Sequence, residues 1–229
     1  VLYVATFLVP TSLSEWRPVC YERYRVAAVI GFKMTIVASV SNSVRAGREA
    51  EAWQRVLREA IRDPRELCRR LELPAVYEAP AERSARLFPV FAPLPFVERM
   101  RPGDPDDPLL RQVLPLAEEQ KEVPGFSDDP VGDRPATSRP GLLRKYRGRA
   151  LLVTTGACAV HCRYCFRRHY PYSEGPHSAA QWDELLRGIA EDRSLQEVLL
   201  SGGDPLMLPD SRLAALAERF AAELEESEA

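Results

Sequence analysis

Lysine, histidine and cysteine are all scarce in this chain of 229 residues. Only three of its 31 basic residues are lysines (Lys33, Lys121 and Lys145), so arginine supplies nearly all of the positive charge. The 33 acidic residues outnumber the basic ones, and the formal net charge is -2. Without a basic excess, the composition favours neither nucleic-acid binding nor attachment to an anionic membrane surface.

A long apolar run is also missing. A membrane-spanning helix needs about 20 consecutive apolar residues. The range 25–44 comes nearest, but Lys33 and the Ser-Asn-Ser sequence at 41–43 interrupt it. The first ten residues are apolar but lack the basic region of a secretory signal peptide. We therefore expect a cytoplasmic protein.

The five cysteines do not suit a disulfide framework, because an odd count in a chain of this length is not typical of a stapled secreted domain. Three of them, Cys158, Cys162 and Cys165, form a Cys-x3-Cys-x2-Cys motif, whereas Cys20 and Cys68 are isolated. Such a compact trio indicates a metal or an iron–sulfur site.

Two kinds of site remain open for this trio. Iron–sulfur clusters normally take four thiolates, so three cysteines would leave one iron of a [4Fe-4S] cluster open to a ligand from outside the chain. The alternative is a zinc site completed by His161 or His169. Structural zinc sites usually take their ligands from two separated pairs, so the spacing favours the cluster.

A glycine-rich turn forms a second motif. Residues 197–201 have the apolar pattern of a short buried strand, which breaks at Gly202-Gly203-Asp204-Pro205. Glycines allow the backbone to approach a ligand closely because they carry no side chain. Taken alone, the motif would be an ordinary tight turn.

Strand and helix patterns alternate around both motifs. We expect a strand over 150–155, a helix with a capping box of Ser178 and Gln181, and an amphipathic helix over 213–224 after the second strand. Two successive βα units predict a parallel sheet. Both motifs follow the carboxyl end of a strand, where βα barrels carry their functional loops.

The upstream chain has a different character. Helical patterns cover 34–114, with helices expected over 53–61, after Asp63-Pro64 and after Asp107-Pro108. Five prolines between Pro115 and Pro140 predict an extended strap over 115–148. The βα region then occupies 149–229.

The aromatic Tyr164 directly precedes the third cysteine, and the motif Cys-x3-Cys-x-aromatic-Cys resembles that of the radical S-adenosylmethionine (SAM) superfamily. The resemblance implies that SAM chelates the open iron and that Tyr164 lies beside its adenine. It also implies that the turn of Ser201, Gly202, Gly203 and Asp204 binds the SAM amino group. A core tyrosine is the alternative for Tyr164.

Four further segments resemble one family in this superfamily. They are Gly103-Asp-Pro-Asp-Asp-Pro and its continuation to 115, Pro124-Gly-Phe-Ser-Asp-Asp-Pro130, the range 140–146, and Cys162-Arg-Tyr-Cys-Phe-Arg-Arg-His169. Together they are similar to the lysine 2,3-aminomutase family, from about Met34 to about Leu213. Within it the similarity is best to the branch whose β-lysine modifies elongation factor P.

The family resemblance implies a radical isomerisation. An electron from a reducing protein would pass through the cluster and cleave SAM to a 5'-deoxyadenosyl radical. L-Lysine held on pyridoxal phosphate (PLP) would then move its amino group from the α to the β carbon and give (R)-β-lysine. Glutamate and arginine aminomutases share the cysteine trio, so another amino acid is an alternative substrate.

Individual residues match family positions. Arg167 matches the arginine that pairs with the substrate carboxylate, a task that suits a planar guanidinium. A solvated surface charge is the alternative. Lys145, Tyr146 and Arg149 match a segment that lines the PLP pocket, although the family usually has arginine in place of Lys145.

The resemblance also implies an N-terminal fragment that is inactive on its own. The family forms a partial (β/α)6 barrel with its PLP lysine in the later part, and no lysine follows Cys165 here. We expect an α/β fold in which a helical region precedes the first two βα units, with the outer edge of the second strand unpaired. Residues 1–33 match nothing in the family, and we expect the natural start at Met34. A non-catalytic zinc-binding module is the other functional hypothesis.

Overall fold

Two units make up the chain in the computed structural model, which describes residues 5–8, 33–35 and 53–228. Among these residues, unit 1 contains 5–8, 33–35, 132–157 and 170–228, and unit 2 contains 53–131 and 158–169. Most of the segment 1–33 lies outside the described residues, so the expected start at Met34 stays a prediction.

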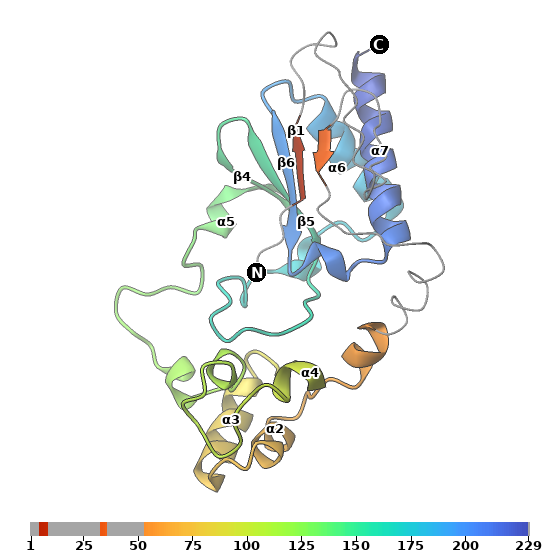
Figure 1. Cartoon of the computed structure of the whole chain (residues 1–229). Coiled ribbons are helices and arrows are strands. Elements are labelled where there is room, and N and C mark those ends of the chain that lie inside the picture. The colour runs from red at the N-terminus through yellow and green to blue at the C-terminus, as the bar shows by residue number, and fades with distance from the viewer. Residues whose placement is uncertain (1–4, 9–32, 36–52, 229) are drawn as a thin grey trace. The chain divides into compact units, whose positions relative to one another are not determined.

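A mixed sheet is the framework of unit 1. In the described part of the chain it has six strands, in the order β2-β1-β6-β5-β4-β3 (Figure 1). The strands are β1 (Ala5–Leu8), β2 (Lys33–Thr35), β3 (Thr137–Arg139), β4 (Leu142–Tyr146), β5 (Arg149–Thr155) and β6 (Glu197–Gly202). The predicted parallel pairing of β5 with β6 is confirmed, and the other neighbours run antiparallel.

The outer edge of β6 is paired, so the expectation of an open edge was wrong. Strand β1 pairs antiparallel with β6, with Ala5 opposite Leu200 and Leu8 opposite Glu197, and β2 pairs with β1. An uncovered edge strand presents free N–H and C=O groups to any other strand. A segment far away in the sequence satisfies those groups here.

Two long helices accompany β5 and β6: α6 (Ala179–Ala190) and α7 (Asp210–Glu228) (Figure 1). The predicted capping box is confirmed, because the Ser178 hydroxyl accepts from the Gln181 N–H and the Gln181 side chain accepts from the Ser178 N–H. Shorter helical turns are η5 (Tyr172–Glu174) and η6 (Pro205–Met207). The order β5-α6-β6-α7 confirms two successive βα units.

Alternating strand residues and the two helices enclose the core of unit 1. Successive strand side chains point to opposite faces of a sheet, so every second residue faces the helices. The buried members of this core are Leu142, Ala150, Leu152, Leu185, Leu186, Ile189, Leu195, Val198, Leu200 and Phe220.

The proline-rich segment contains more regular structure than an extended strap. It includes η4 (Ala117–Gln120), α5 (Asp133–Ala136) and the hairpin of β3 and β4. Pro140 lies in the turn between β3 and β4, where a missing N–H removes no bond of the ladder. Proline composition therefore did not exclude strands on either side of it.

Unit 2 is built from short helices. They are α2 (Pro64–Arg70), η2 (Ala75–Tyr77), α3 (Glu78–Ala85), α4 (Leu94–Val97), η3 (Leu110–Gln112) and η4, and residues 53–58 are also helical. Asp63 caps α2 by accepting from the Arg65 N–H at 2.9 Å, and Pro64 is its first residue, as predicted. The helix expected after Asp107 is only the single turn η3, because Pro115 disfavours helical geometry in the residue before it.

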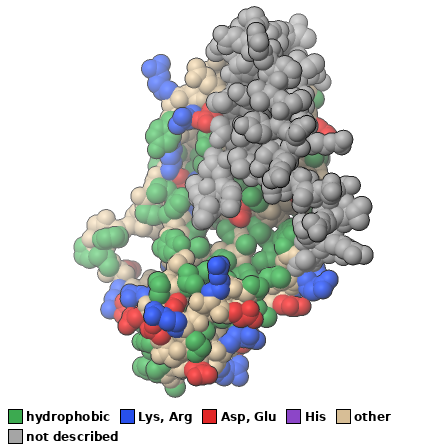
Figure 2. Space-filling model, viewed as in Figure 1, with side chains coloured by type: hydrophobic (Ala, Val, Ile, Leu, Met, Phe, Trp, Pro, Cys, Tyr) green, Lys and Arg blue, Asp and Glu red, His purple; other side chains and the backbone are tan. Residues whose placement is uncertain are grey.

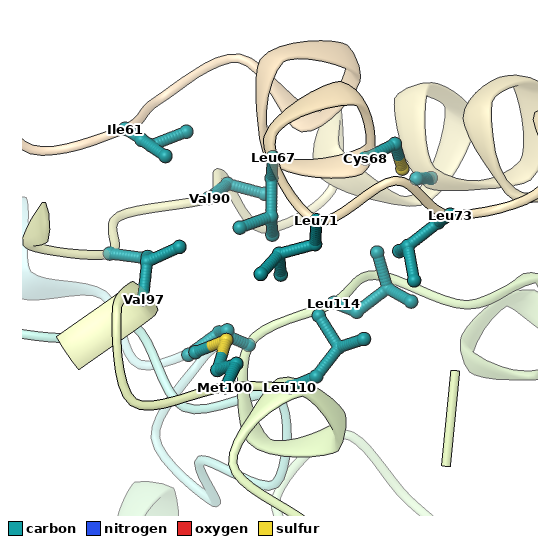
Figure 3. Packing of buried hydrophobic residues seen from close by; sticks show 13 residues of the cluster. Ile61, Leu67, Cys68, Leu71, Leu73, Val90, Val97, Met100, Leu110 and Leu114 are labelled. Carbon is teal, nitrogen blue, oxygen red and sulfur yellow. The ribbon is translucent and has the colours of Figure 1, made fainter. Parts of the chain in front are cut away.

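A separate hydrophobic core holds unit 2 together (Figure 3). Leu67 and Cys68 of α2 and its C-cap Leu71 belong to this cluster together with Leu110 and Leu114. Leu67, Cys68 and Leu110 are 0% exposed, so the core is completely closed to solvent at these positions. The core of unit 2 shares no residue with the core of unit 1.

The surface of unit 2 carries charges of both signs, which are mixed on the face shown in Figure 2. Within the described ranges, no helix combines the length and the apolar character needed to cross a membrane.

Candidate functional site

The cysteine loop, residues 158–169, belongs to unit 2 and is anchored there through His161. The His161 N–H donates to the Phe91 carbonyl at 3.0 Å, and its Nδ1 lies 3.0 Å from the Pro89 carbonyl. Its ring stacks on Phe88 at 5.0 Å between centroids. Burial lowers the pKa of His161, so the ring serves as a neutral anchor of the loop.

Two arginines of the same loop share one carboxylate partner. Arg163 and Arg168 both pair with the carboxylate of Glu119, each at 2.6 Å. The Arg163 N–H also donates to the Gln112 carbonyl at 2.7 Å. Within the same loop, the Cys165 N–H donates to the Cys162 carbonyl at 3.0 Å and closes a tight turn.

The three loop cysteines carry thiols that form no disulfide among the described residues and are partly accessible. Their donor type suits the iron of a cluster, because thiolates are the usual ligands of iron–sulfur centres. In this conformation, however, no three His, Cys, Asp or Glu side chains among the described residues gather into a group that could hold a metal. The residues thus fit a cluster by chemistry and by their place on one anchored loop, and their side chains would have to turn toward a common centre to bind it.

Tyr164 and Arg167 lie on this loop in different environments. Tyr164 is 69% exposed, and its hydroxyl donates to Gln112 at 3.3 Å, so it is not a core tyrosine. Arg167 is only 7% exposed, and its guanidinium lies 5.1 Å from the centroid of the Phe166 ring. The alternative of a solvated surface charge therefore does not describe Arg167.

The glycine turn belongs to unit 1 and lies against the end of β5. The Gly203 N–H donates to the Thr155 carbonyl at 2.7 Å, and the Asp204 N–H donates to the Ala157 carbonyl at 2.8 Å. The Asp204 side chain caps η6 by accepting from the Leu206 N–H at 3.0 Å. The parallel strands β5 and β6 thus end side by side, as expected for a site at their carboxyl ends.

Gly202 is required by the fold itself. Its φ is +129°, and a Cβ there would lie 2.2 Å from the Thr155 carbonyl oxygen. Only glycine permits both this dihedral and this close approach of two backbones. The glycine-rich motif alone indicated a ligand contact, and its contact with Thr155 could not be read from the sequence.

The residues matched to a PLP pocket lie at the other end of β5. Tyr146 pairs with Arg149 in the β4–β5 hairpin. Arg149 pairs with Glu197 and Lys145 with Asp133, each at 2.5 Å. With a rise of about 3.3 Å per residue, the strand separates Arg149 from Thr155 by about 20 Å. The structure therefore does not bring these three residues together with the glycine turn.

Comparisons with known proteins agree on one family. The Radical SAM superfamily matches residues 152–226, which include the cysteine loop and the glycine turn. The L-lysine 2,3-aminomutase of Escherichia coli (strain K12) is 47% identical over 164 residues, which cover 71% of this chain and 48% of that protein. The chain belongs to the radical SAM lysine 2,3-aminomutase family.

Two further relatives define the extent of the match. The L-lysine 2,3-aminomutase of Haemophilus influenzae is 42% identical over 173 residues, covering 76% of this chain and 51% of that protein. The protein of the same name from Clostridium subterminale is 32% identical over 119 residues, covering 52% of this chain and 29% of that protein. The chain thus spans about half the length of the E. coli and H. influenzae members of the family.

Glu119 is the main residue of this family member that the sequence analysis overlooked. It lies 44 residues before Arg163, in a segment read only for its prolines. One signal was available, since a loop with Arg163, Arg167 and Arg168 in close succession needs buried counter-charge if any of them is buried.

Proposed function

We propose that this chain provides the radical-generating part of an amino-acid 2,3-aminomutase. The observation that supports it most is the Cys-x3-Cys-x2-Cys loop, anchored in unit 2 and included in the Radical SAM match. In this proposal β5 and β6 are the first two strands of a partial barrel.

Cys158, Cys162 and Cys165 would hold a [4Fe-4S] cluster with one iron left for SAM. When bound, the cluster and SAM supply a 5'-deoxyadenosyl radical, and PLP stabilises the substrate radical during amino migration. The exposed ring of Tyr164 offers a flat surface for an adenine.

The glycine turn would bind the SAM ammonium through carbonyl oxygens. An ammonium only donates hydrogen bonds, so it needs acceptors. The N–H groups of Gly203 and Asp204 donate to the Thr155 and Ala157 carbonyls within unit 1, and these hydrogen bonds orient the turn of Ser201 to Asp204.

Arg167 would pair with the substrate carboxylate. Arg167 is 7% exposed and matches the family position that pairs with the substrate carboxylate, and both observations support this role. A buried guanidinium binds a carboxylate in bidentate geometry more strongly than an exposed one. L-Lysine is the proposed substrate, because the relatives named above are L-lysine 2,3-aminomutases.

The finer assignments rest on the family resemblance. They comprise (R)-β-lysine as product for modification of elongation factor P, a reducing protein as electron donor, and a PLP pocket that includes Lys145, Tyr146 and Arg149. The ion pairs of Lys145 and Arg149 would orient these side chains.

Anaerobic reconstitution with iron and sulfide tests the proposal. We expect the chain to bind a cluster, seen by its absorbance and by iron and sulfide content, and to cleave SAM to 5'-deoxyadenosine when reduced. Replacing Cys158, Cys162 and Cys165 together by alanine should abolish both, whereas Cys68→Ala should abolish neither. A stable zinc site with no cluster and no SAM cleavage would refute the proposal in favour of a zinc-binding module.

A further inference from the structure

A buried ionic group lies beside the cysteine loop in unit 2. The carboxylate of Glu119 accepts four hydrogen bonds. Its Oε1 accepts from Arg163 Nε and from the Leu116 N–H, each at 3.0 Å. Its Oε2 accepts from Arg163 Nη2 and from Arg168 Nη2, each at 2.6 Å. The three charged side chains are only 5%, 13% and 14% exposed.

The same two guanidiniums also donate hydrogen bonds to backbone carbonyls. Arg163 Nη1 donates to the Phe88 carbonyl at 2.6 Å, and Arg168 Nη1 donates to the Arg163 carbonyl at 3.2 Å. Both guanidiniums also lie over the Phe88 ring, at 5.1 and 5.3 Å. One carboxylate therefore orients the stretch from 163 to 168, which contains Cys165.

The charges of this group do not balance. Glu119 offers one negative charge to two guanidiniums, so the group keeps one net positive charge next to Cys162 and Cys165 in the sequence. Removing the carboxylate would leave two buried cations without a counter-charge, which is strongly unfavourable. It would also add positive charge near any cluster on the loop, and net charge is one of the factors that set cluster potentials.

We propose that Glu119 is a positioning residue for the cysteine loop, and that it sets the conformation of residues 163–168 and the charge beside the cluster. The part of this inference that concerns the cluster rests on the proposed function. The part that concerns loop conformation depends only on the contacts within unit 2.

Two substitutions should shift the reduction potential of the cluster in opposite directions. Glu119→Gln removes a negative charge and should raise the potential, because an uncompensated guanidinium stabilises the more negative, reduced cluster. Arg168→Gln removes a positive charge and should lower it. A purely structural role would not make the sign of the shift follow the sign of the charge removed.

The experiment compares both variants with Glu118→Gln in the full chain. Glu118 is the neighbouring residue and is 69% exposed in its pair with Lys121, so this control loses the same charge at the surface. Hydrogen exchange of residues 158–169 is measured without a cluster, and the midpoint potential is measured after reconstitution. Exchange should be about tenfold or more faster in Glu119→Gln than in the control, the factor expected when one charge-assisted hydrogen bond is lost.

The outcomes separate the two proposals. If the wild-type chain takes up no cluster, the proposed function is overturned, and the exchange comparison still decides whether Glu119 anchors the loop. If Glu119→Gln exchanges like Glu118→Gln, the anchoring inference is overturned. If the two potentials shift in the same direction or do not shift, the effect of Glu119 on the cluster is overturned. If Glu119→Gln does not fold, Arg168→Gln and the control decide both questions.

Discussion

Single residues show how little conformational freedom the glycine turn and the cysteine loop have. Gly202 combines a positive φ with a backbone approach that leaves no room for a methyl group beside Thr155. Glu119 and Arg163 contribute side chains from distant parts of the sequence to one buried hydrogen-bond group. At this scale, the site depends on steric and ionic contacts that tolerate few substitutions.

Gly202→Ala should lower the free energy of unfolding of unit 1 by at least about 2 kcal/mol, because it adds a clash to an unfavourable dihedral. Gly132→Ala is the matched control in the same unit. Its φ is +67°, but the nearest atom to an added Cβ is Pro135 Cγ at 3.8 Å, so it carries the dihedral cost alone. That cost is about 1 kcal/mol. Urea denaturation followed by circular dichroism measures both, and equal losses would contradict the clash with Thr155.

The described cysteines should differ sharply in reactivity. Cys68 is 0% exposed, and burial, with smaller contributions from Glu78 and Asp63, raises its pKa to about 11. The thiolate is the reactive form, so Cys68 should resist alkylation at about pH 8, where an ordinary thiol is partly ionised. Cys158, Cys162 and Cys165 are partly accessible and should react in the protein without a cluster. Mass spectrometry after brief exposure to iodoacetamide measures this, and modification of Cys68 at the rate of the loop cysteines would refute it.

Whole elements were predictable where the signal is local. Strands β5 and β6 and helix α6 follow from short apolar patterns and one capping box, which act within a few residues of each other. The strands β1, β2, β3 and β4 were missed, because each is only three to five residues long and is defined by its partner strand. The helix expected after Asp107-Pro108 is only the single turn η3, although the Asp107 side chain does accept from the Leu109 and Leu110 N–H groups at its start.

Carboxylates at element ends should make the protein sensitive to acid. For Asp107, hydrogen bonds from the Leu110 and Arg101 N–H groups and the Arg101 side chain lower the pKa against the opposing effect of burial. For Glu119, burial alone would raise the pKa, but hydrogen bonds from Arg163, the Leu116 N–H and Arg168 outweigh it and lower the pKa. A carboxyl with a lowered folded-state pKa stabilises the fold above its unfolded pKa of about 4, and this stabilisation is lost as the pH falls through the folded-state pKa.

Asp107→Asn tests this dependence. We expect the variant to be less stable than the wild type at neutral pH, and the difference to shrink below about pH 4 as the wild-type carboxyl becomes protonated. Asp106→Asn is the control, because Asp106 is 83% exposed in its pair with Arg111 and should matter little at any pH. Denaturation curves at several pH values measure the difference. A gap between wild type and Asp107→Asn that stays constant as the pH falls would contradict the assignment.

At the scale of the whole molecule, the two hydrophobic cores share no residue, so each unit has its own source of stability. From the sequence, we expect domains that follow one another along the chain. The units are instead built from non-contiguous segments: the cysteine loop 158–169 belongs to unit 2, although the residues on both sides of it belong to unit 1.

Truncations in the two cores should therefore act locally. Leu114→Ala removes a side chain from the core of unit 2, and Leu152→Ala removes one from the core of unit 1, where each leucine is 1% exposed. Each should cost about 2–5 kcal/mol. Hydrogen exchange followed by peptide mass spectrometry should locate the lost protection in unit 2 for Leu114→Ala and in unit 1 for Leu152→Ala. Equal loss in both units for either variant would show that the chain unfolds as one cooperative body.

The sequence by itself determined the cysteine trio, the glycine turn, the two βα units and the family, because each of these is written in residues that are close together along the chain. Only the tertiary structure decided that Glu119 holds Arg163 and Arg168, that β1 covers the edge of β6, and that Arg149 lies far from the glycine turn. These features depend on which distant segments meet, and that choice follows from burial and pairing across the whole fold, which no short stretch of sequence contains.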